Sequence, residues 1–184
     1  MNNNPHPLTN YDGHMNTSTG IKFNIFDPTP EMVNITDIAR GLAFKAHFGG
    51  QSEKFFSIAQ HCFLVCDQLP YDWMKFGKYG YTGRDLFLCA LLHDASEAYI
   101  GDMIKPIKIH FPRFKEIENK IQSVILTKFG VNPDIMLNVK PFDIIAQKIE
   151  YGDFYKEQSM ISRYLSPEQS EIEFYQRFYE YQNL

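Results

Sequence analysis

The amino-acid sequence predicts an all-α protein. Apolar residues recur at helical spacing in successive segments from about residue 35 to the C-terminus. Capping residues precede several of these segments, and glycine or proline follows them. Only residues 20–26 (GIKFNIF) alternate polar and apolar side chains like a strand, and Asp27-Pro28-Thr29-Pro30 then breaks that pattern. We therefore expect a compact bundle of about six or seven helices, to which residues 20–26 allow one short N-terminal β-hairpin to be added.

The first two helices are expected before residue 70. One covers residues 35–42, with Asn34 or Thr36 as its N-cap and Gly49-Gly50 closing the element. The second covers residues 55–69 and is followed by a proline. Each has one apolar face, made by Ile35, Ile38, Ala39 and Leu42 in the first helix and by Phe55, Ile58, Cys62, Val65 and Leu69 in the second.

A third helix, residues 82–98, is expected at the centre of the core. Thr82 and Asp85 form a Thr-x-x-Asp cap, and the run LFLCALL that follows is apolar on every side. A helix that is apolar all round is a buried one. Residues 100–112 contain a glycine and two prolines and are expected to be largely loop.

Further helices are expected in the C-terminal half. Residues 114–129 are amphipathic and precede Gly130, a suitable C-cap. Residues 141–155 begin with a proline, which suits the first position of a helix. The last helix opens at residues 166–169 (SPEQ), a capping box with proline in its first turn.

Length and composition indicate one globular domain. The 184 residues are 44% hydrophobic and 22% charged, and the formal charge of −4 provides no basic field for nucleic-acid binding. No apolar run reaches the roughly 20 residues that span a bilayer, and the N-terminus has neither the basic nor the apolar region of a signal peptide. We expect a flexible leader at residues 1–19, a single domain at residues 20–184, and a cytoplasmic protein without nucleic-acid or membrane partners.

The cysteines and the C-terminal aromatics are expected to be mainly structural. Three cysteines without a secretory signal argue against disulfides, and the pair Cys62 and Cys66 lacks the second pair that a zinc finger requires. The aromatic segment near the C-terminus is interpreted first as core packing and second as a subunit contact, because aromatic side chains are costly to expose. On the second interpretation the protein is a homo-oligomer.

Acidic residues crowd the end of the central helix. Asp94, Glu97 and Asp102 lie within nine residues and directly follow His93. The segment taken alone is equally compatible with a solvated helix end that carries a favourable histidine. However, crowded carboxylates repel one another unless they share a cation or a proton. The number of acids therefore favours a functional cluster.

Two more residues become candidate site residues only when they are considered together with this cluster. His61 lies among apolar neighbours in the second helix, where a single histidine is more often a satisfied core residue. Asp143 lies near the start of a later helix, where an acid is generally favourable. Together with His93-Asp94 they give the order H…HD…D on three separate helices.

This order resembles the HD superfamily of phosphohydrolases. The surrounding segments SIAQHCFLV (57–65), LLHDASEAYIGDMIKPIK (91–108) and NITDIARGLAFKAHFGG (34–50) are similar to one branch, the bacterial 5′-deoxynucleotidases and small phage nucleotide phosphohydrolases. The similarity covers about residues 20–155. It implies an HD-type helical bundle in which one divalent ion, Mn²⁺, Co²⁺, Mg²⁺ or Zn²⁺, is held by His61, His93, Asp94 and Asp143.

The resemblance also implies roles for residues around the ion. Glu97 and Asp102 match the acids that serve the phosphate and the catalytic proton transfers. Lys108 matches a basic position suited to phosphate oxygens, and Lys105 is equally compatible with a solvated loop lysine.

The segment before the first metal histidine departs from the family pattern. Relatives commonly have Arg-Phe-Gly-Gly where this chain has His47-Phe48-Gly49-Gly50. We expect His47, Phe48 and Gly49 to face the substrate, although a histidine cannot reproduce a bidentate arginine clamp. His47 is compatible with a phosphate contact, with stacking on a base, or with simple packing.

The resemblance predicts hydrolysis of phosphate from a deoxynucleotide. A deoxyadenine nucleotide is preferred by family analogy, with a triphosphohydrolase releasing deoxynucleoside and polyphosphate. The alternative is a 5′-deoxynucleotidase that accepts deoxynucleoside monophosphates with several bases. A second alternative, from a different class, is a non-catalytic HD binding module. The expected small-molecule partner is the nucleotide substrate.

Overall fold

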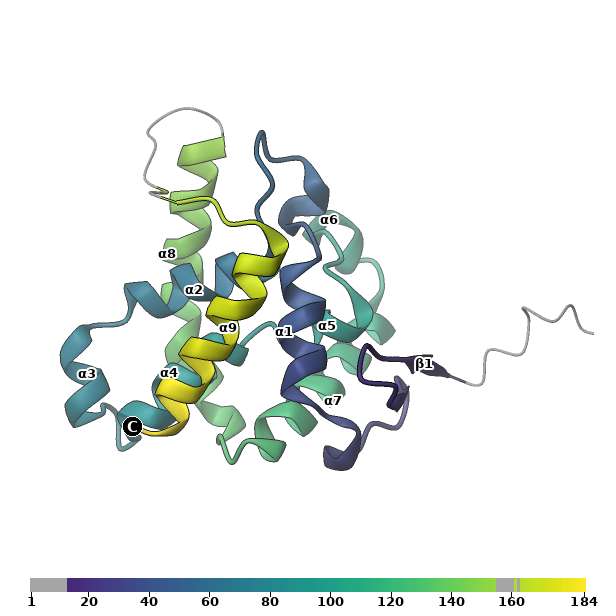
Figure 1. Ribbon diagram of the computed structural model, residues 1–184, viewed down its shortest axis with the longest axis horizontal. Coiled ribbons are helices and arrows are strands. Elements are labelled where there is room, and N and C mark those ends of the chain that lie inside the picture. Colours follow the sequence, from purple (N-terminus) through teal and green to yellow (C-terminus); the bar gives the residue numbers. More distant parts are fainter. Residues whose placement is uncertain (1–12, 155–160, 162) are drawn as a thin grey trace, which may run out of the picture.

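The computed structural model describes residues 13–154, 161 and 163–184, and most of them are helical (Figure 1). The helices of six or more residues are α1 (Ile35–Ala43), α2 (Ile58–Gln68), α3 (Tyr71–Phe76), α4 (Gly83–Leu92), α7 (Pro112–Lys128), α8 (Met136–Phe154) and α9 (Pro167–Gln182). Single turns form α5 (Glu97–Ile100) and α6 (Lys105–Lys108), and short 3₁₀ helices form η1 (Pro30–Met32), η2 (His47–Gly50) and η3 (Pro133–Ile135). The expected all-α fold is confirmed.

A short antiparallel hairpin precedes the helices, as the alternating segment allowed. Strands β1 (His14–Asn16) and β2 (Lys22–Asn24) pair with Met15 opposite Phe23. Residues 13–19 therefore do not belong to a leader, which corrects that expectation. The reason is the carboxylate of Asp37 in α1, which accepts hydrogen bonds from the Ser18 hydroxyl and from the backbone N–H and hydroxyl of Thr19. Residues 1–12 of the expected leader lie outside the described residues.

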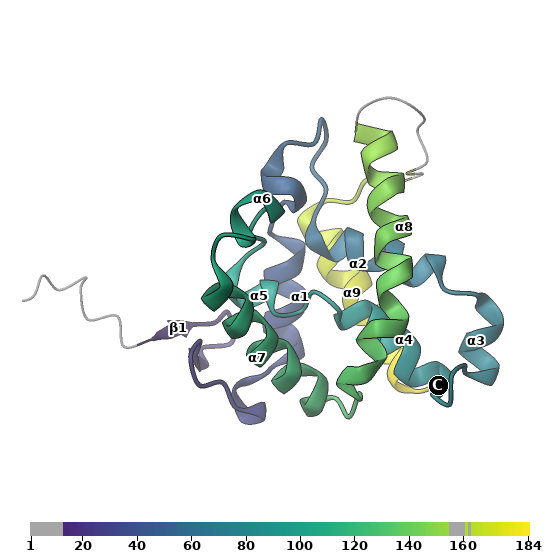
Figure 2. The ribbon, with the colours of Figure 1, turned by 180° about the vertical axis from the view of Figure 1, so that it is seen from behind.

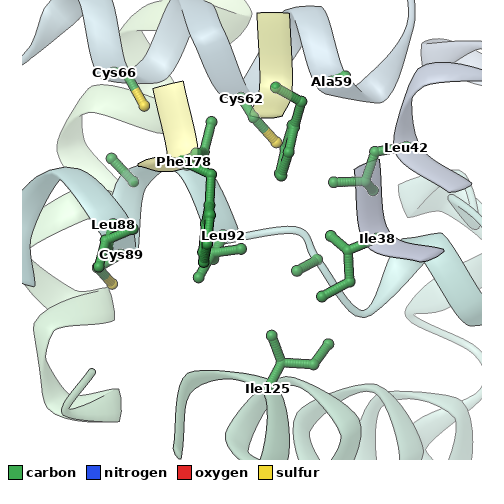
Figure 3. Packing of buried hydrophobic residues seen from close by; sticks show 14 of the residues in the cluster. Ile38, Leu42, Ala59, Cys62, Cys66, Leu88, Cys89, Leu92, Ile125 and Phe178 are labelled. Carbon is green, nitrogen blue, oxygen red and sulfur yellow. The ribbon is translucent and has the colours of Figure 1, made fainter. Parts of the chain in front are cut away.

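The core is built around α4, whose residues from Leu86 to Leu92 are all buried. Helices α2 and α9 both pack on α4, and α1 packs between α9 and α5 (Figure 1). Figure 3 shows side chains of α1, α2, α4, α7 and α9 meeting in one apolar cluster. Seen from behind, α8 runs beside α2 and α4 (Figure 2). Helix α4 therefore has the central position that the sequence predicted, and in this position it packs against both α2 and α8.

The cysteines and several C-terminal aromatics belong to this core. Cys62, Cys66 and Cys89 are free and buried, and burial raises the pKa of Cys62 to about 12, so that the thiol keeps its proton. Phe174 and Phe178 of α9 are also buried. No helix in the described part of the chain is both long and apolar enough to cross a membrane.

Helix α8 begins earlier than the proline at residue 141 suggested. Asn132 caps η3 through a hydrogen bond from the Asp134 backbone N–H, and η3 leads directly into α8 at Met136. Pro141 consequently lies inside the helix, on its exposed side. An internal proline removes one helical hydrogen bond, and here the preceding cap and turn start the helix before it.

The central helix ends earlier than expected, because a side chain from α7 breaks it. In an α-helix the backbone N–H of Ser96 would bond to the carbonyl of Leu92. Instead the Gln122 side chain accepts a hydrogen bond from Ser96 N–H at 3.0 Å and donates one to the Leu92 carbonyl at 2.6 Å. Insertion of a side chain into the hydrogen-bond ladder is a known cause of helix interruption. The expected helix over residues 82–98 is thus wrong at its C-terminal end, and residues 93–96 form turns between α4 and α5.

A glycine brings α1 close to α5. A Cβ atom at Gly41 would lie 2.7 Å from the carbonyl oxygen of Ala98, closer than packed atoms allow. The same region is fixed by Lys45, whose Nζ donates to the carbonyl oxygens of Glu97 and Ala98 at 2.8 and 2.5 Å. The backbone that carries Glu97 is therefore held from two sides.

Candidate metal centre

Three mutually packed helices present the four expected ligands. His61 lies in the middle of α2, His93 is the C-cap of α4 with Asp94 in the turn after it, and Asp143 lies in α8. His61, His93 and Asp143 are buried, whereas the Asp94 side chain is 30% exposed. The cluster therefore reaches solvent on the side of Asp94.

The ligand atoms of these residues converge on a small volume. The Nε2 atom of His61 lies 3.2 Å from Nε2 of His93 and 3.2 Å from Oδ1 of Asp143. The Oδ2 atom of Asp94 lies 3.5 Å from Nε2 of His61 and 3.1 Å from Nε2 of His93. Atoms that each lie about 2.0–2.2 Å from one ion are separated by about 3–4 Å from one another. The observed spacings agree with this.

Hydrogen bonds on the far side of each imidazole orient the rings. Nδ1 of His93 lies 2.8 Å from the carbonyl oxygen of Ala90, and Nδ1 of His61 lies 2.7 Å from Oε1 of Glu150. A carbonyl and an ionised carboxylate both accept from a ring N–H, so each Nδ1 is then the donor. In the neutral rings the two Nε2 atoms then carry lone pairs, and they face each other and two carboxylates. Four electron-rich atoms at this spacing require positive charge between them.

The pKa values of these residues also indicate a site that attracts positive charge. Burial lowers the pKa of both histidines, but their neighbours together outweigh burial and raise the pKa values well above the ordinary range, with Glu150 the largest of these for His61 and Asp94 for His93. Burial likewise raises the pKa of Asp94, but the neighbouring His93 charge reverses that and holds the pKa below its usual value. The cluster therefore attracts protons, as a site for a cation does. The buried His61, His93 and Asp143 could hold a metal ion, and a mixed imidazole and carboxylate set fits several divalent ions.

Glu97 and Asp102 lie beside the four ligands in an unusual electrostatic setting. Glu97 is buried, and its Oε2 atom has no hydrogen-bond partner among the described residues. Burial raises the pKa of Glu97 well above its ordinary value, and the charges of Asp94 and Asp102 raise it further. Burial and Asp94 also raise the pKa of Asp102. A carboxyl group with a raised pKa keeps its proton to higher pH than an ordinary one and can donate it.

The two lysines predicted near the phosphate differ in position. Nζ of Lys108 lies 3.5 Å from Oε1 of Glu97 and 2.7 Å from Oε1 of the buried Glu118 in α7. Lys105 begins α6 and is exposed, and no hydrogen bond or ion pair within residues 13–154 joins it to the cluster. The structure thus brings Lys108, and not Lys105, to the site.

The segment His47-Phe48-Gly49 also reaches the cluster. The imidazole of His47 lies 4.5 Å from that of His61 between ring centroids, and its Nε2 is 3.9 Å from Oδ2 of Asp102. Burial, with the charge of His61, lowers the pKa of His47 to about 3. A permanently charged contact of His47 with phosphate is therefore disfavoured. Phe48 has a left-handed backbone (φ 53°), which is strained for a side chain of its size and is common at functional sites.

Three buried polar residues at the site were missed in the sequence. They are Glu118 and Gln122 of α7 and Glu150 of α8. Glu150 could have been found, because it lies seven positions after Asp143 and thus on the same face of one helix. No comparable signal marks Glu118 or Gln122, because α7 reaches the site only through tertiary packing.

Comparison with known proteins gives a family but no activity. No protein-family model matches the chain. It is 35% identical over 119 residues to YfdR of Escherichia coli strain K12, a protein named as uncharacterized, and this match covers 65% of the chain but only 60% of YfdR. It is 32% identical over 139 residues to the uncharacterized protein RCAP_rcc00048 of Rhodobacter capsulatus, covering 72% of the chain and 68% of that protein. The chain therefore belongs to the same family as RCAP_rcc00048.

Proposed function

We propose that the protein is a metal-dependent phosphohydrolase of the HD type that acts on deoxynucleotides, with a deoxyadenine nucleotide as the first candidate. The observation that carries the proposal is the convergence of His61, His93, Asp94 and Asp143 beside a buried acid with a raised pKa, Glu97. A divalent ion bound there would lower the pKa of a bound water and offset the charge of a phosphoryl group.

The surrounding side chains supply what phosphate hydrolysis needs besides the ion. Protonated Glu97 can donate its proton to the leaving oxygen, which would otherwise depart as an alkoxide. The Oδ2 atom of Asp102 lies 3.9 Å from Nε2 of His47, and this carboxyl group can orient a water or the substrate hydroxyl. Lys108, already paired with Glu97 and Glu118, offers a point charge for phosphate oxygens.

Aromatic side chains beside the cluster support a nucleoside rather than a simple phosphate ester. The rings of His47 and Phe48 lie 4.0 Å apart, and those of Phe48 and the half-exposed Tyr151 lie 5.1 Å apart, between centroids. Since a neutral His47 carries no charge to offer a phosphate, contact with a base suits its ring better than ion pairing.

Product analysis tests the proposal and separates its variants. The purified chain is incubated with all deoxynucleoside mono-, di- and triphosphates in Mn²⁺, Co²⁺, Mg²⁺ or Zn²⁺. Release of deoxyadenosine and tripolyphosphate from dATP supports the triphosphohydrolase, and inorganic phosphate from monophosphates supports the 5′-deoxynucleotidase. Nucleotide binding without any turnover, in every metal, would contradict the proposal and favour a binding module.

A further inference from the structure

One buried carboxylate, Glu150, stands between two histidines of the site. Its side chain is completely buried in α8. Oε1 lies 2.7 Å from Nδ1 of His61, and Oε2 lies 3.6 Å from Nδ1 of His47. One carboxylate thus faces both a candidate ligand and the segment expected to meet the substrate.

The contact with His61 determines which nitrogen of that ring faces the ion. An ionised Glu150 carboxylate, stabilised by the neighbouring His61, accepts at Oε1, and His61 then donates through Nδ1. The ring then turns Nε2 toward His93 and Asp143. A carboxylate behind a ligating histidine fixes its orientation and strengthens it as a donor.

The contact with His47 is of a different kind. Nδ1 of His47 and Oε2 of Glu150 are both buried, and neither has a hydrogen-bond partner among the described residues. They face each other at 3.6 Å, slightly beyond hydrogen-bond distance. The backbone N–H of His47 is bonded to the Phe56 carbonyl, so the ring stays near Glu150. A small movement of the ring or the carboxylate would pair two groups that are costly to leave unpaired.

We propose that Glu150 is a positioning residue that holds His61 for metal binding and His47 for the substrate, without itself being a ligand. This inference rests on the proposed metal centre, but it does not require phosphohydrolase activity. It couples the two parts of the site, because the same carboxylate faces the ring of the candidate ligand His61 and the ring of His47.

Cobalt binding in the absence of nucleotide tests the first half of the proposal. Affinity for Co²⁺ is measured by competition with a chromophoric chelator, and the visible Co²⁺ spectrum reports the coordination. We expect Glu150→Ala to lower the affinity about 10- to 100-fold and to change the spectrum. Glu150→Gln should lose less, since its amide oxygen can still accept from Nδ1 of His61. If Glu150→Ala does not fold, the Co²⁺ affinity and spectrum of Glu150→Gln are compared with those of the wild type instead.

The matched control is Asp37→Asn. Asp37 is also a buried, hydrogen-bonded carboxylate, but it lies in α1 and binds the hairpin turn. This variant should bind Co²⁺ like the wild type even if its melting temperature falls. Wild-type affinity in folded Glu150→Ala would overturn the proposal. So would two Co²⁺ ions in the wild type and one in Glu150→Ala, because Glu150 would then be a ligand.

Hydrogen exchange tests the second half. Backbone amides of residues 47–51 should exchange faster in Glu150→Ala than in Asp37→Asn, and equal rates would overturn the role toward His47. Failure of the proposed function is distinguishable from these results. Wild-type chain that binds Co²⁺ but hydrolyses no nucleotide contradicts only the function, whereas wild-type chain that binds no Co²⁺ overturns the role of Glu150.

Discussion

Neighbouring carboxyl groups at this site carry opposite protonation preferences. Asp94 and Asp143 lie against the histidines, and their pKa values fall below the ordinary range despite burial. Glu97 lies three residues after Asp94, and burial with the charges of Asp94 and Asp102 raises its pKa instead. Neighbouring carboxyl groups with diverging pKa values are typical of acid–base catalysis, because one carboxyl stays ionised while another keeps a proton.

Glu97→Gln separates proton transfer from metal binding. Glutamine has nearly the same shape but has no acidic proton, so bound metal should be retained while kcat falls by about 10²- to 10⁴-fold. In the wild type, kcat should also fall as the pH rises through the raised pKa of Glu97, because the acid form is then lost. The measurement is a kcat profile together with the metal content. Wild-type turnover in Glu97→Gln would show that Glu97 has no acid role.

Asp37 gives a prediction about stability and pH away from the site. Burial raises its pKa, but hydrogen bonds from Ser18 and Thr19 outweigh burial and lower it. The folded state therefore gains stability above the ordinary pKa of about 4 and loses it as the pH falls through the lowered value. Asp37→Ala should reduce the free energy of unfolding by about 1.5–3 kcal/mol at pH 7.

The pH dependence of that difference is the check. Urea unfolding of wild type and Asp37→Ala at pH 7 and near pH 3 should show a smaller difference at the lower pH. A difference that does not change with pH would mean that the ionised carboxylate adds nothing to the fold.

At the level of helices, boundaries set by local chemistry could be predicted. The expected capping box at Ser166 is present in the structure. The second helix begins at Ile58, after a capping box at Ser57, and not at residue 55 as expected. Boundaries decided by distant residues could not. The end of α4 depends on Gln122, which lies 30 positions after Leu92. The start of α8 depends on the turn η3, which outweighs the preference of Pro141 for a first position.

Gln122→Met tests whether the interruption of α4 shapes the site. Methionine fills a similar volume but cannot bond to Ser96 N–H or the Leu92 carbonyl, so these two groups should pair with each other as in a continuous helix. Asp94 and Glu97 would then turn away from α2. We expect at least about a tenfold loss of metal affinity, comparable to removing a supporting hydrogen bond.

Gln68→Met is the matched control, because the Gln68 side chain donates to the carbonyl of Leu64 within its own helix and, among the described residues, has no hydrogen bond to the site. Metal titration by calorimetry and helix content by circular dichroism are compared in both variants. Unchanged affinity in Gln122→Met would show that the turn after His93 forms without this side chain.

For the molecule as a whole, the candidate site joins segments far apart in the sequence. The four candidate ligands could be predicted because their residue types and order match a known sequence pattern. The structure adds three buried polar residues that contact predicted site residues or the backbone beside them. They are Glu118, Gln122 and Glu150. Buried supporting polar residues are hard to predict from one sequence, since their role depends on which helices pack together. A ligand bound across α2, α4 and α8 should stabilise the entire fold.

The most direct test of the account is the metal content of the purified chain. Elemental analysis after dialysis should find one divalent ion per wild-type chain and none in His93→Ala, since that change removes one nitrogen of the buried ligand set. The wild-type ion should also raise the melting temperature relative to chelated protein. Full occupancy in His93→Ala, or no bound ion in the wild type in any of Mn²⁺, Co²⁺, Mg²⁺ and Zn²⁺, would contradict the account.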